Sequence, residues 1–306
     1  MLHVALIGDR GSGKTTFLGL LYATLVRSGS DSADDLRFHT TFESLEEVTT
    51  LFQQMMSGGF PDAAVKEGLH ELSFTLGLRK AKHGFLPRLG SRKWNADEAT
   101  SVQFTMPGSL GEERPGFLQG STIGTGPWRD VLDADAIILL ADSANLAPKG
   151  EPSSPGPMAT YDGQADALLA AIQRWRSRSG HEVLHPIFLL SKFDSVKAEV
   201  LKAMNLEADP PGPAEVAARA AYAGTLLSPN LPRTLATVQG GRGGRMRFDK
   251  PTYFFSWVRT ETKDSSASEK IRLRRIDGGG WEPDYSRDEY LGLLECLADI
   301  AAKTKD

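Results

Sequence analysis

The sequence predicts an α/β fold, a three-layer α/β/α sandwich in which helices cover both faces of a mostly parallel sheet. Three observations support it. Short apolar segments alternate along the chain with longer segments of helical periodicity. Two of the short segments, Ala136–Ala141 and Pro186–Leu190, are apolar nearly throughout, as strands buried on both faces of a parallel sheet are. A glycine-rich turn joins the first predicted strand to the first predicted helix.

The chain begins with a predicted strand, a turn and a helix. Leu2–Ile7 predicts the strand because it is apolar, contains β-branched residues and stops at Gly8. The helix is expected because apolar residues then recur at the spacing i, i+3, i+4 and i+7. These residues are Leu18, Leu21, Tyr22 and Leu25.

One helix and two strands are predicted next. Ser44–Met56 has the helical pattern, and Ser44 with Glu47 three residues later matches a capping box at its start. Leu69–Leu78 alternates apolar and polar residues, as a strand with one solvated face does. Ser101–Met106 predicts the following strand, after a basic stretch rich in turn residues.

The second half continues the alternation. Gln164–Arg178, between the two apolar strands, predicts a helix with one apolar side. Ala214–Leu227 predicts another helix, Thr252–Val258 a last strand and Arg287–Lys303 a closing helix. Because no Pro/Gly linker separates two strand sets, residues 1–306 are expected to form a single domain. Its insertions are predicted near residues 79–100, 144–163 and 200–250.

Composition and charge exclude several classes of protein. The chain has 35 Lys+Arg and 39 Asp+Glu, a formal net charge of −4, so DNA binding through a global basic field is not expected. Cys296 is the single cysteine, which excludes an intramolecular disulfide and a Cys-rich zinc site. No apolar run approaches the roughly 20 residues of a membrane span, and no basic leader precedes the first apolar stretch. We therefore expect a cytoplasmic protein.

Residues 8–15, Gly-Asp-Arg-Gly-Ser-Gly-Lys-Thr, match the P-loop pattern G-x-x-x-x-G-K-[ST] between a predicted strand and helix. The glycines let successive N–H groups point at phosphate oxygens, and the following helix adds the positive end of its dipole. Lys14 is expected to bridge the β- and γ-phosphates, and the Thr15 hydroxyl to bind Mg²⁺. The predicted phosphate site comprises Gly8, Asp9, Arg10, Gly11, Ser12, Gly13, Lys14, Thr15 and Thr16. The fold is thus predicted to be a P-loop NTPase sandwich, elaborated by insertions.

A later segment indicates which nucleotide base is bound. Ser191-Lys192-Phe193-Asp194 follows an apolar strand and resembles the [NT]-K-x-D signature of GTPases. In that signature the Asp accepts hydrogen bonds from guanine N1 and the exocyclic amine, whereas adenine offers no such donor pair. The Lys stem lies along the base plane. Ser256 and Trp257, at the end of the last predicted strand, resemble the loop whose backbone contacts guanine O6.

The order of these elements resembles the TRAFAC class of P-loop GTPases, which includes Ras-like and translation-factor GTPases. Phe104-Thr-Met-Pro-Gly108, followed by Ala134-Asp-Ala-Ile-Ile-Leu-Leu-Ala-Asp142, is similar to that class's D-x-P-G … A-D-A-I-I-x-V-x-D stretch. Gly58-Gly59-Phe60-Pro61 resembles the G-W/F-P-x-x-T of prokaryotic double-GTPase proteins. The resemblance covers roughly residues 1–260. It implies a GTP/GDP switch that uses Mg²⁺, with switch segments at 57–68 and 105–120 and a protein effector or activator.

Departures from the family pattern bear on catalysis. Thr105 replaces the Asp that orients Mg²⁺, and Ser109 stands where relatives have a water-positioning Gln or His. Ala63 and Ala64 lie near the expected switch threonine. Because loss of such elements costs about 10³–10⁵ in rate, slow hydrolysis is predicted. The catalytic candidates are Lys14, Arg10 and Thr105.

Several alternatives remain open from the sequence. Arg10 either stabilises transition-state charge or is a solvated arginine on the loop rim. Asp142, Glu112 and Glu113 either hold Mg²⁺ through water or are a turn cap and a solvated pair. A non-hydrolysing nucleotide-binding scaffold and an ATP-dependent P-loop ATPase or kinase are the rival functions. A homo- or hetero-oligomer is possible.

Overall fold

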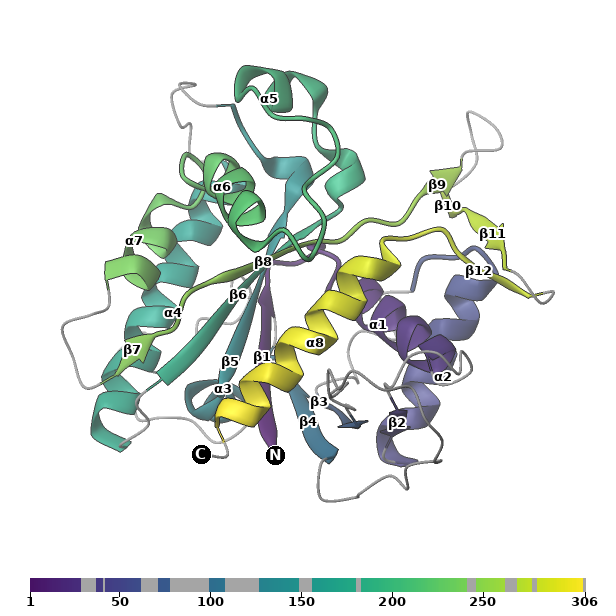
Figure 1. The fold of residues 1–306 in the computed structure, drawn as a ribbon, viewed down its shortest axis with the longest axis horizontal. Helices are drawn as coiled ribbons and strands as arrows, with labels where there is room; N and C mark the ends of the chain where they lie inside the picture. The colour runs from purple at the N-terminus through teal and green to yellow at the C-terminus, as the bar shows by residue number, and fades with distance from the viewer. Residues whose placement is uncertain are drawn as a thin grey trace, which may run out of the picture.

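The computed structural model describes residues 1–28, 37–40, 42–61, 71–77, 99–107, 127–148, 156–179, 183–240, 246–261, 269–276 and 280–304. Within them lies an eight-stranded sheet in the order β2-β3-β4-β1-β5-β6-β7, with β8 also paired to β6 (Figure 1). The strands are β2 (Arg37–Thr40), β3 (Glu71–Gly77), β4 (Ala99–Thr105), β1 (Leu2–Gly8), β5 (Ala136–Asp142), β6 (Val183–Ser191), β7 (Arg247–Phe248) and β8 (Thr252–Phe255). Strands β4, β1, β5, β6 and β8 run parallel, whereas β3 is antiparallel to β2 and β4.

Helices cover both faces of this sheet (Figure 1). Because successive strand residues point to opposite faces, Val4 and Leu6 of β1 pack into one core, and Ala5 and Ile7 into the other. The first core is closed by α1 (Lys14–Ser28), α2 (Phe42–Met56) and α8 (Arg287–Lys303). The second is closed by α3 (Pro127–Asp133), α4 (Pro157–Ser179), α6 (Val216–Leu227) and α7 (Pro232–Gly240). The predicted three-layer sandwich with a mostly parallel sheet is confirmed.

Several predicted boundaries were wrong. Helix α2 begins at Phe42, so Ser44 lies inside its first turn and does not cap it. The segment 144–163 contains the start of α4, which begins at Pro157. The helix predicted over Ala214–Leu227 begins at Val216 as α6, and the segment 200–250 also holds α7 and the end of α5 (Ala198–Ala203). Strand β8 ends at Phe255, and Val258 instead forms an isolated antiparallel bridge with Tyr285.

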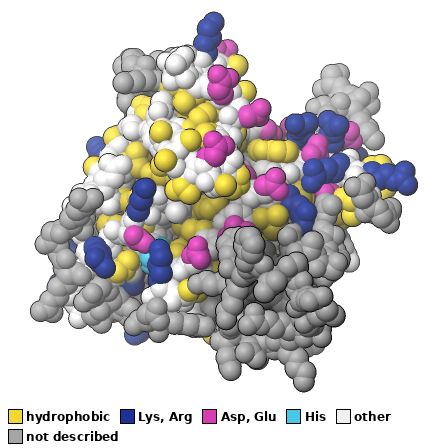
Figure 2. Space-filling view, in the orientation of Figure 1, with side chains coloured by type: hydrophobic (Ala, Val, Ile, Leu, Met, Phe, Trp, Pro, Cys, Tyr) yellow, Lys and Arg dark blue, Asp and Glu magenta, His cyan; other side chains and the backbone are white. Residues whose placement is uncertain are grey.

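A small β arm lies between β8 and α8. It contains β9 (Thr260–Glu261), β10 (Lys270–Ile271), β11 (Leu273–Arg275) and β12 (Trp281–Pro283). Figure 2 shows Lys and Arg side chains gathered over this arm. Arg259 and Arg272 both lie near the carboxylate of Asp284, at 3.9 and 3.7 Å. The arm contacts the turn after α2, where the Ile271 N–H donates to the Gly58 carbonyl over 2.8 Å.

No helix in the described part of the chain combines the length and apolar character needed to cross a bilayer.

Candidate nucleotide-binding site

The candidate site lies where the parallel strands end. The pairing register sets Gly8 of β1 beside Leu140, Asp142 of β5 beside Ser191, and Leu190 of β6 beside Phe255. The carboxyl ends of β1, β5, β6 and β8 therefore share one edge of the sheet. In open α/β sheets, ligands bind in the crevice outside such an edge.

Glycine is required at three positions of the P-loop. Gly11 and Gly13 have φ values of +74° and +92°, a left-handed conformation that side-chain-bearing residues rarely adopt. A Cβ atom on Gly8 would lie 2.5 Å from Ser12 Oγ and 3.0 Å from the Cβ of Leu140. The loop closes on itself through the Ser12 N–H, which donates to the Asp9 carbonyl over 3.2 Å.

The loop carries a cation and an unsatisfied hydroxyl. The Lys14 ammonium folds back and donates to the carbonyl oxygens of Gly8 (2.7 Å) and Asp9 (2.9 Å). The Ser12 hydroxyl is 1% exposed and has no hydrogen-bond partner among the described residues. Because buried polar groups are normally paired, this hydroxyl fits a site that is completed by a polar ligand. An anionic phosphate chain suits both groups.

The remaining P-loop residues are more accessible. Arg10 is exposed, and its backbone N–H donates to the Asp9 carboxylate over 2.9 Å. Thr15 and Thr16 are half-buried in the first turn of α1. The motif did not reveal Tyr161 of α4, whose buried hydroxyl has no partner among the described residues. Burial and, to a lesser extent, the Asp9 carboxylate raise the pKa of Tyr161.

The structure brings the second motif against the P-loop. The Ser191 hydroxyl donates to the Ser12 carbonyl (2.7 Å) and to the Ala141 carbonyl (3.2 Å). Ser191 is buried, and its Cβ lies 3.9 Å from where a Cβ of Gly13 would be. The segment Ser191–Asp194 therefore begins directly beside the phosphate loop, although the two motifs are far apart in sequence.

Lys192 and Asp142 form an ion pair of 2.7 Å at the same edge. Lys192 has a φ of +50°, which turns the chain out of β6. The other carboxylate oxygen of Asp142 accepts a hydrogen bond from the Ala144 N–H at 3.1 Å. Asp142 thus caps the short helix Ser143–Asn145 and pairs with Lys192, which favours the turn-cap interpretation over a Mg²⁺-holding role.

Asp194 projects from the short helix Phe193–Ser195, and the residue as a whole is exposed. Partial desolvation of its carboxyl group raises its pKa, and Glu269 adds to this; a backbone hydrogen bond and Lys192 oppose it. The preceding Phe193 is buried, so the helix is anchored on its inner side.

Ser256 and Trp257 follow the end of β8, and hydrogen bonds within the protein hold their backbone. The Ser256 N–H donates to the Leu190 carbonyl (2.8 Å), and the Trp257 N–H donates to the Ser286 hydroxyl (3.1 Å). Both N–H groups therefore have acceptors inside the protein, and the contact of this backbone with guanine O6 stays a prediction. The Ser256 carbonyl instead accepts from the Phe193 N–H over 3.0 Å.

The segment Phe104–Gly108, which resembles the D-x-P-G motif, is described only as far as Pro107. Thr105 ends β4 beside Ala5 of β1 and is 3% exposed. Of the predicted switch segments, only residues 57–61 and 105–107 are described. Six positions discussed above lie outside the described residues: Ala63, Ala64, Gly108, Ser109, Glu112 and Glu113. Among the described side chains, no group of three or more His, Cys, Asp and Glu is arranged to hold a metal ion.

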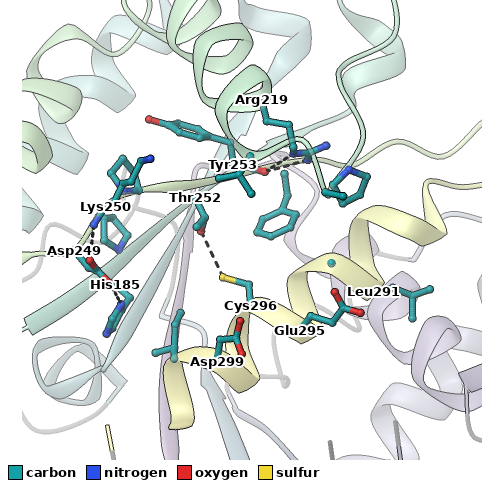
Figure 3. A pocket seen from close by; sticks show the side chains of 18 of the residues that line it. His185, Arg219, Asp249, Lys250, Thr252, Tyr253, Leu291, Glu295, Cys296 and Asp299 are labelled. Carbon is teal, nitrogen blue, oxygen red and sulfur yellow. Dashed lines mark hydrogen bonds and ion pairs between the residues drawn. The ribbon is translucent and has the colours of Figure 1, made fainter. Parts of the chain in front are cut away.

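A cavity of about 670 Å³ lies beside β8, between α6 and α8 (Figure 3). Its lining includes Thr252, Cys296 and Asp299 but none of the P-loop or Ser191–Asp194 residues. The side chain of Arg219, at one end, donates to the Tyr253 carbonyl at 3.0 Å. The cavity is therefore separate from the candidate nucleotide site, although strand β8 contributes to the lining of the cavity and leads into Ser256.

No protein-family profile and no curated protein sequence matches this chain. Among solved structures, one similar chain belongs to the signal recognition particle receptor SRb-GTP/SRX complex from Chaetomium thermophilum. It is 14% identical with a TM-score of 0.36, and the match covers 83% of this chain and 90% of that chain. A likeness this low carries no argument. The P-loop NTPase fold rests instead on the strand order and on the P-loop between β1 and α1.

Proposed function

We propose that the protein is a cytoplasmic guanine-nucleotide switch that binds GTP with Mg²⁺ and hydrolyses it slowly to GDP. One observation carries the proposal: the Ser191 hydroxyl is hydrogen bonded to the Ser12 carbonyl over 2.7 Å. This contact joins the segment that resembles a guanine signature to the phosphate loop. A single nucleotide would thus meet both segments at the edge where β1 and β6 end.

The phosphate half of the site fits a triphosphate with Mg²⁺. The left-handed Gly11 and Gly13 shape the loop, and the Ser12 hydroxyl, which has no partner within the described ranges, offers a further donor. Lys14 would exchange the carbonyl oxygens of Gly8 and Asp9 for the β- and γ-phosphates. Thr15, in the first turn of α1, is the residue that would hold Mg²⁺, and the ion would neutralise charge on the phosphates.

In the part of the site that would bind the base, Asp194 is the residue that would select guanine over adenine. Its carboxylate would accept hydrogen bonds from the two guanine donors, and ATP would leave it without partners. Lys192 would lie along the ring with its stem while its ammonium stays on Asp142. Arg10, exposed on the loop rim, remains a candidate for stabilising charge on the γ-phosphate.

Replacing Asp194 with Ala should lower GTP affinity about 100-fold and leave ATP affinity unchanged, since hydrogen bonds to a charged group contribute about 1.5–3 kcal/mol. Equilibrium titration of both nucleotides in the presence of Mg²⁺ measures this. Glu199→Ala, which removes an exposed carboxylate in the first turn of α5, is the matched control. Undiminished GTP binding by Asp194→Ala would refute the assignment of the base.

A non-hydrolysing scaffold is the second candidate, and the buried Thr105 at the place of the Mg²⁺-orienting Asp favours it. We expect slow but measurable hydrolysis, because every fixed position of the P-loop pattern that binds the phosphates is present. Single-turnover cleavage of GTP with Mg²⁺ should therefore be faster in the unaltered protein than in Lys14→Ala. Equal rates in the two proteins would favour the scaffold.

A protein activator or effector is part of the proposal. Slow intrinsic hydrolysis calls for a partner that supplies missing catalytic groups, and such groups are worth about 10³–10⁵ in rate. The switch segments 57–68 and 105–120 are where we expect that partner to act.

A further inference from the structure

The buried side chain of Tyr290, in the first turn of α8, contacts Ser256 on the base side of the candidate site and Phe17, which is hydrogen bonded to the P-loop, on the phosphate side. We propose that Tyr290 is a positioning residue for guanine recognition, acting through Ser256 on the segment that carries Asp194. This inference rests on the proposed function, because it concerns how the same site reads the base.

The first link is a hydrogen bond of 2.6 Å between the Tyr290 hydroxyl and the Ser256 hydroxyl. Both residues are buried, with 1% and 5% of their surface exposed, so water does not compete for this bond. Burial raises the pKa of Tyr290, and the hydroxyl therefore stays protonated at neutral pH. The bond fixes Ser256 from the side of α8.

The second link runs from Ser256 to the base-reading segment. The Ser256 carbonyl accepts from the Phe193 N–H over 3.0 Å, and its own N–H donates to Leu190. Phe193 immediately precedes Asp194 in the same short helix. Ser256 thus holds the backbone from which the Asp194 carboxylate projects. It would therefore influence the preference for guanine without touching the base.

Two neighbours of Tyr290 hold the residues on either side of Ser256. The Glu289 carboxylate accepts from the Phe255 N–H over 2.9 Å. The Ser286 hydroxyl accepts from the Trp257 N–H over 3.1 Å. Three consecutive residues are therefore held by the start of α8.

The third link joins Tyr290 to the phosphate half. Its ring stacks on Phe17 of α1, with the ring centroids 5.6 Å apart and the planes at 28°. The Phe17 N–H donates to the Gly13 carbonyl of the P-loop over 2.8 Å. The hydroxyl of Tyr290 thus acts on the base side and its ring on the phosphate side. Removing the hydroxyl alone therefore tests the effect on the base side while the ring contact with Phe17 is kept.

The test is Tyr290→Phe, which keeps the ring and removes the bond to Ser256. Tyr285→Phe is the matched control: Tyr285 is also 1% exposed and adjoins Tyr290, but its hydroxyl bonds to Thr24 of α1 at 2.9 Å. We expect the ratio of GTP to ATP affinity to fall about three- to tenfold in Tyr290→Phe only, the range for one neutral hydrogen bond. Ser256→Ala removes the same bond from its other end and should give the same fall.

An equal fall in both tyrosine variants would mean general loosening and would overturn the proposal, as would an unchanged ratio in Tyr290→Phe. Hydrogen exchange of the nucleotide-free protein separates this inference from the proposed function. Peptides covering residues 192–196 should exchange faster in Tyr290→Phe than in Tyr285→Phe, whichever nucleotide the protein prefers. Equal exchange in the two variants would contradict the positioning role even if GTP binding is confirmed.

Discussion

Replacing Lys14 with Ala is expected to weaken GTP binding about 100-fold or more. In the structure the Lys14 ammonium already lies over the P-loop, 2.7 Å from the Gly8 carbonyl and 2.9 Å from that of Asp9. Bound phosphates would replace these neutral acceptors with charged ones, and each charge-assisted hydrogen bond is worth about 1.5–3 kcal/mol. Titration with a fluorescent GTP analogue and Mg²⁺ measures the loss.

Lys202→Ala, which removes an exposed lysine of α5, controls for the change in overall charge. The two variants should unfold at similar denaturant concentrations, because Lys14 is half-buried and its hydrogen bonds to the Gly8 and Asp9 carbonyls lie within its own loop. If Lys14→Ala retained the GTP affinity of Lys202→Ala, the P-loop would not be the phosphate site.

Replacing Arg219 with Leu is expected to destabilise the fold by about 3–5 kcal/mol, the cost of breaking a buried ion pair. The Arg219 guanidinium meets the Glu289 carboxylate in a two-pronged contact, and the two side chains are 4% and 10% exposed. It also donates to the Tyr253 carbonyl (Figure 3) and lies 4.8 Å from the ring centroid of Phe255. Leucine would leave Glu289 buried without its cation.

Urea denaturation of three further variants checks the cause. Arg219→Leu combined with Glu289→Leu should be less destabilised than the sum of the single changes, because no unpaired charge remains. Lys303→Ala breaks an exposed pair with Asp249 at 3.7 Å and should cost about 0–1 kcal/mol. Additive effects of the Arg219 and Glu289 changes would show that the pair is not the source of the stability.

The sequence predicted the central parallel strands and the turn between β1 and α1 because both depend on local signals. Ala136–Ala141 and Pro186–Leu190 are apolar along their whole length, and β5 and β6 extend them by one residue and four residues in total. The early start of α4 was missed although a local signal existed. Pro157 occupies its first helical position, and α3 and α7 begin in the same way with Pro127 and Pro232.

The contacts that assemble the site could not be predicted, because they join residues distant in the chain. The Ser191 hydroxyl meets the Ser12 carbonyl across 179 positions, and Tyr290 meets Ser256 across 34. Arg219 lies within a helix, where a sequence pattern gives no reason to expect a buried charge; its partner Glu289 is 70 positions away. The backbone partners of Ser256, Leu190 and Phe193, were not predictable for the same reason, since they lie at the end of β6 and in the short helix after it.

The central claim is that one edge of the sheet binds a guanine nucleotide. Its most direct test is a titration of the full chain with GTP and with ATP, each with Mg²⁺, under the same conditions. We predict that GTP binds at least tenfold more tightly, since a charged hydrogen bond contributes about 1.5–3 kcal/mol and each 1.4 kcal/mol is a factor of ten. ATP binding as tightly as GTP, or more tightly, would contradict the claim and would favour an ATP-dependent P-loop enzyme.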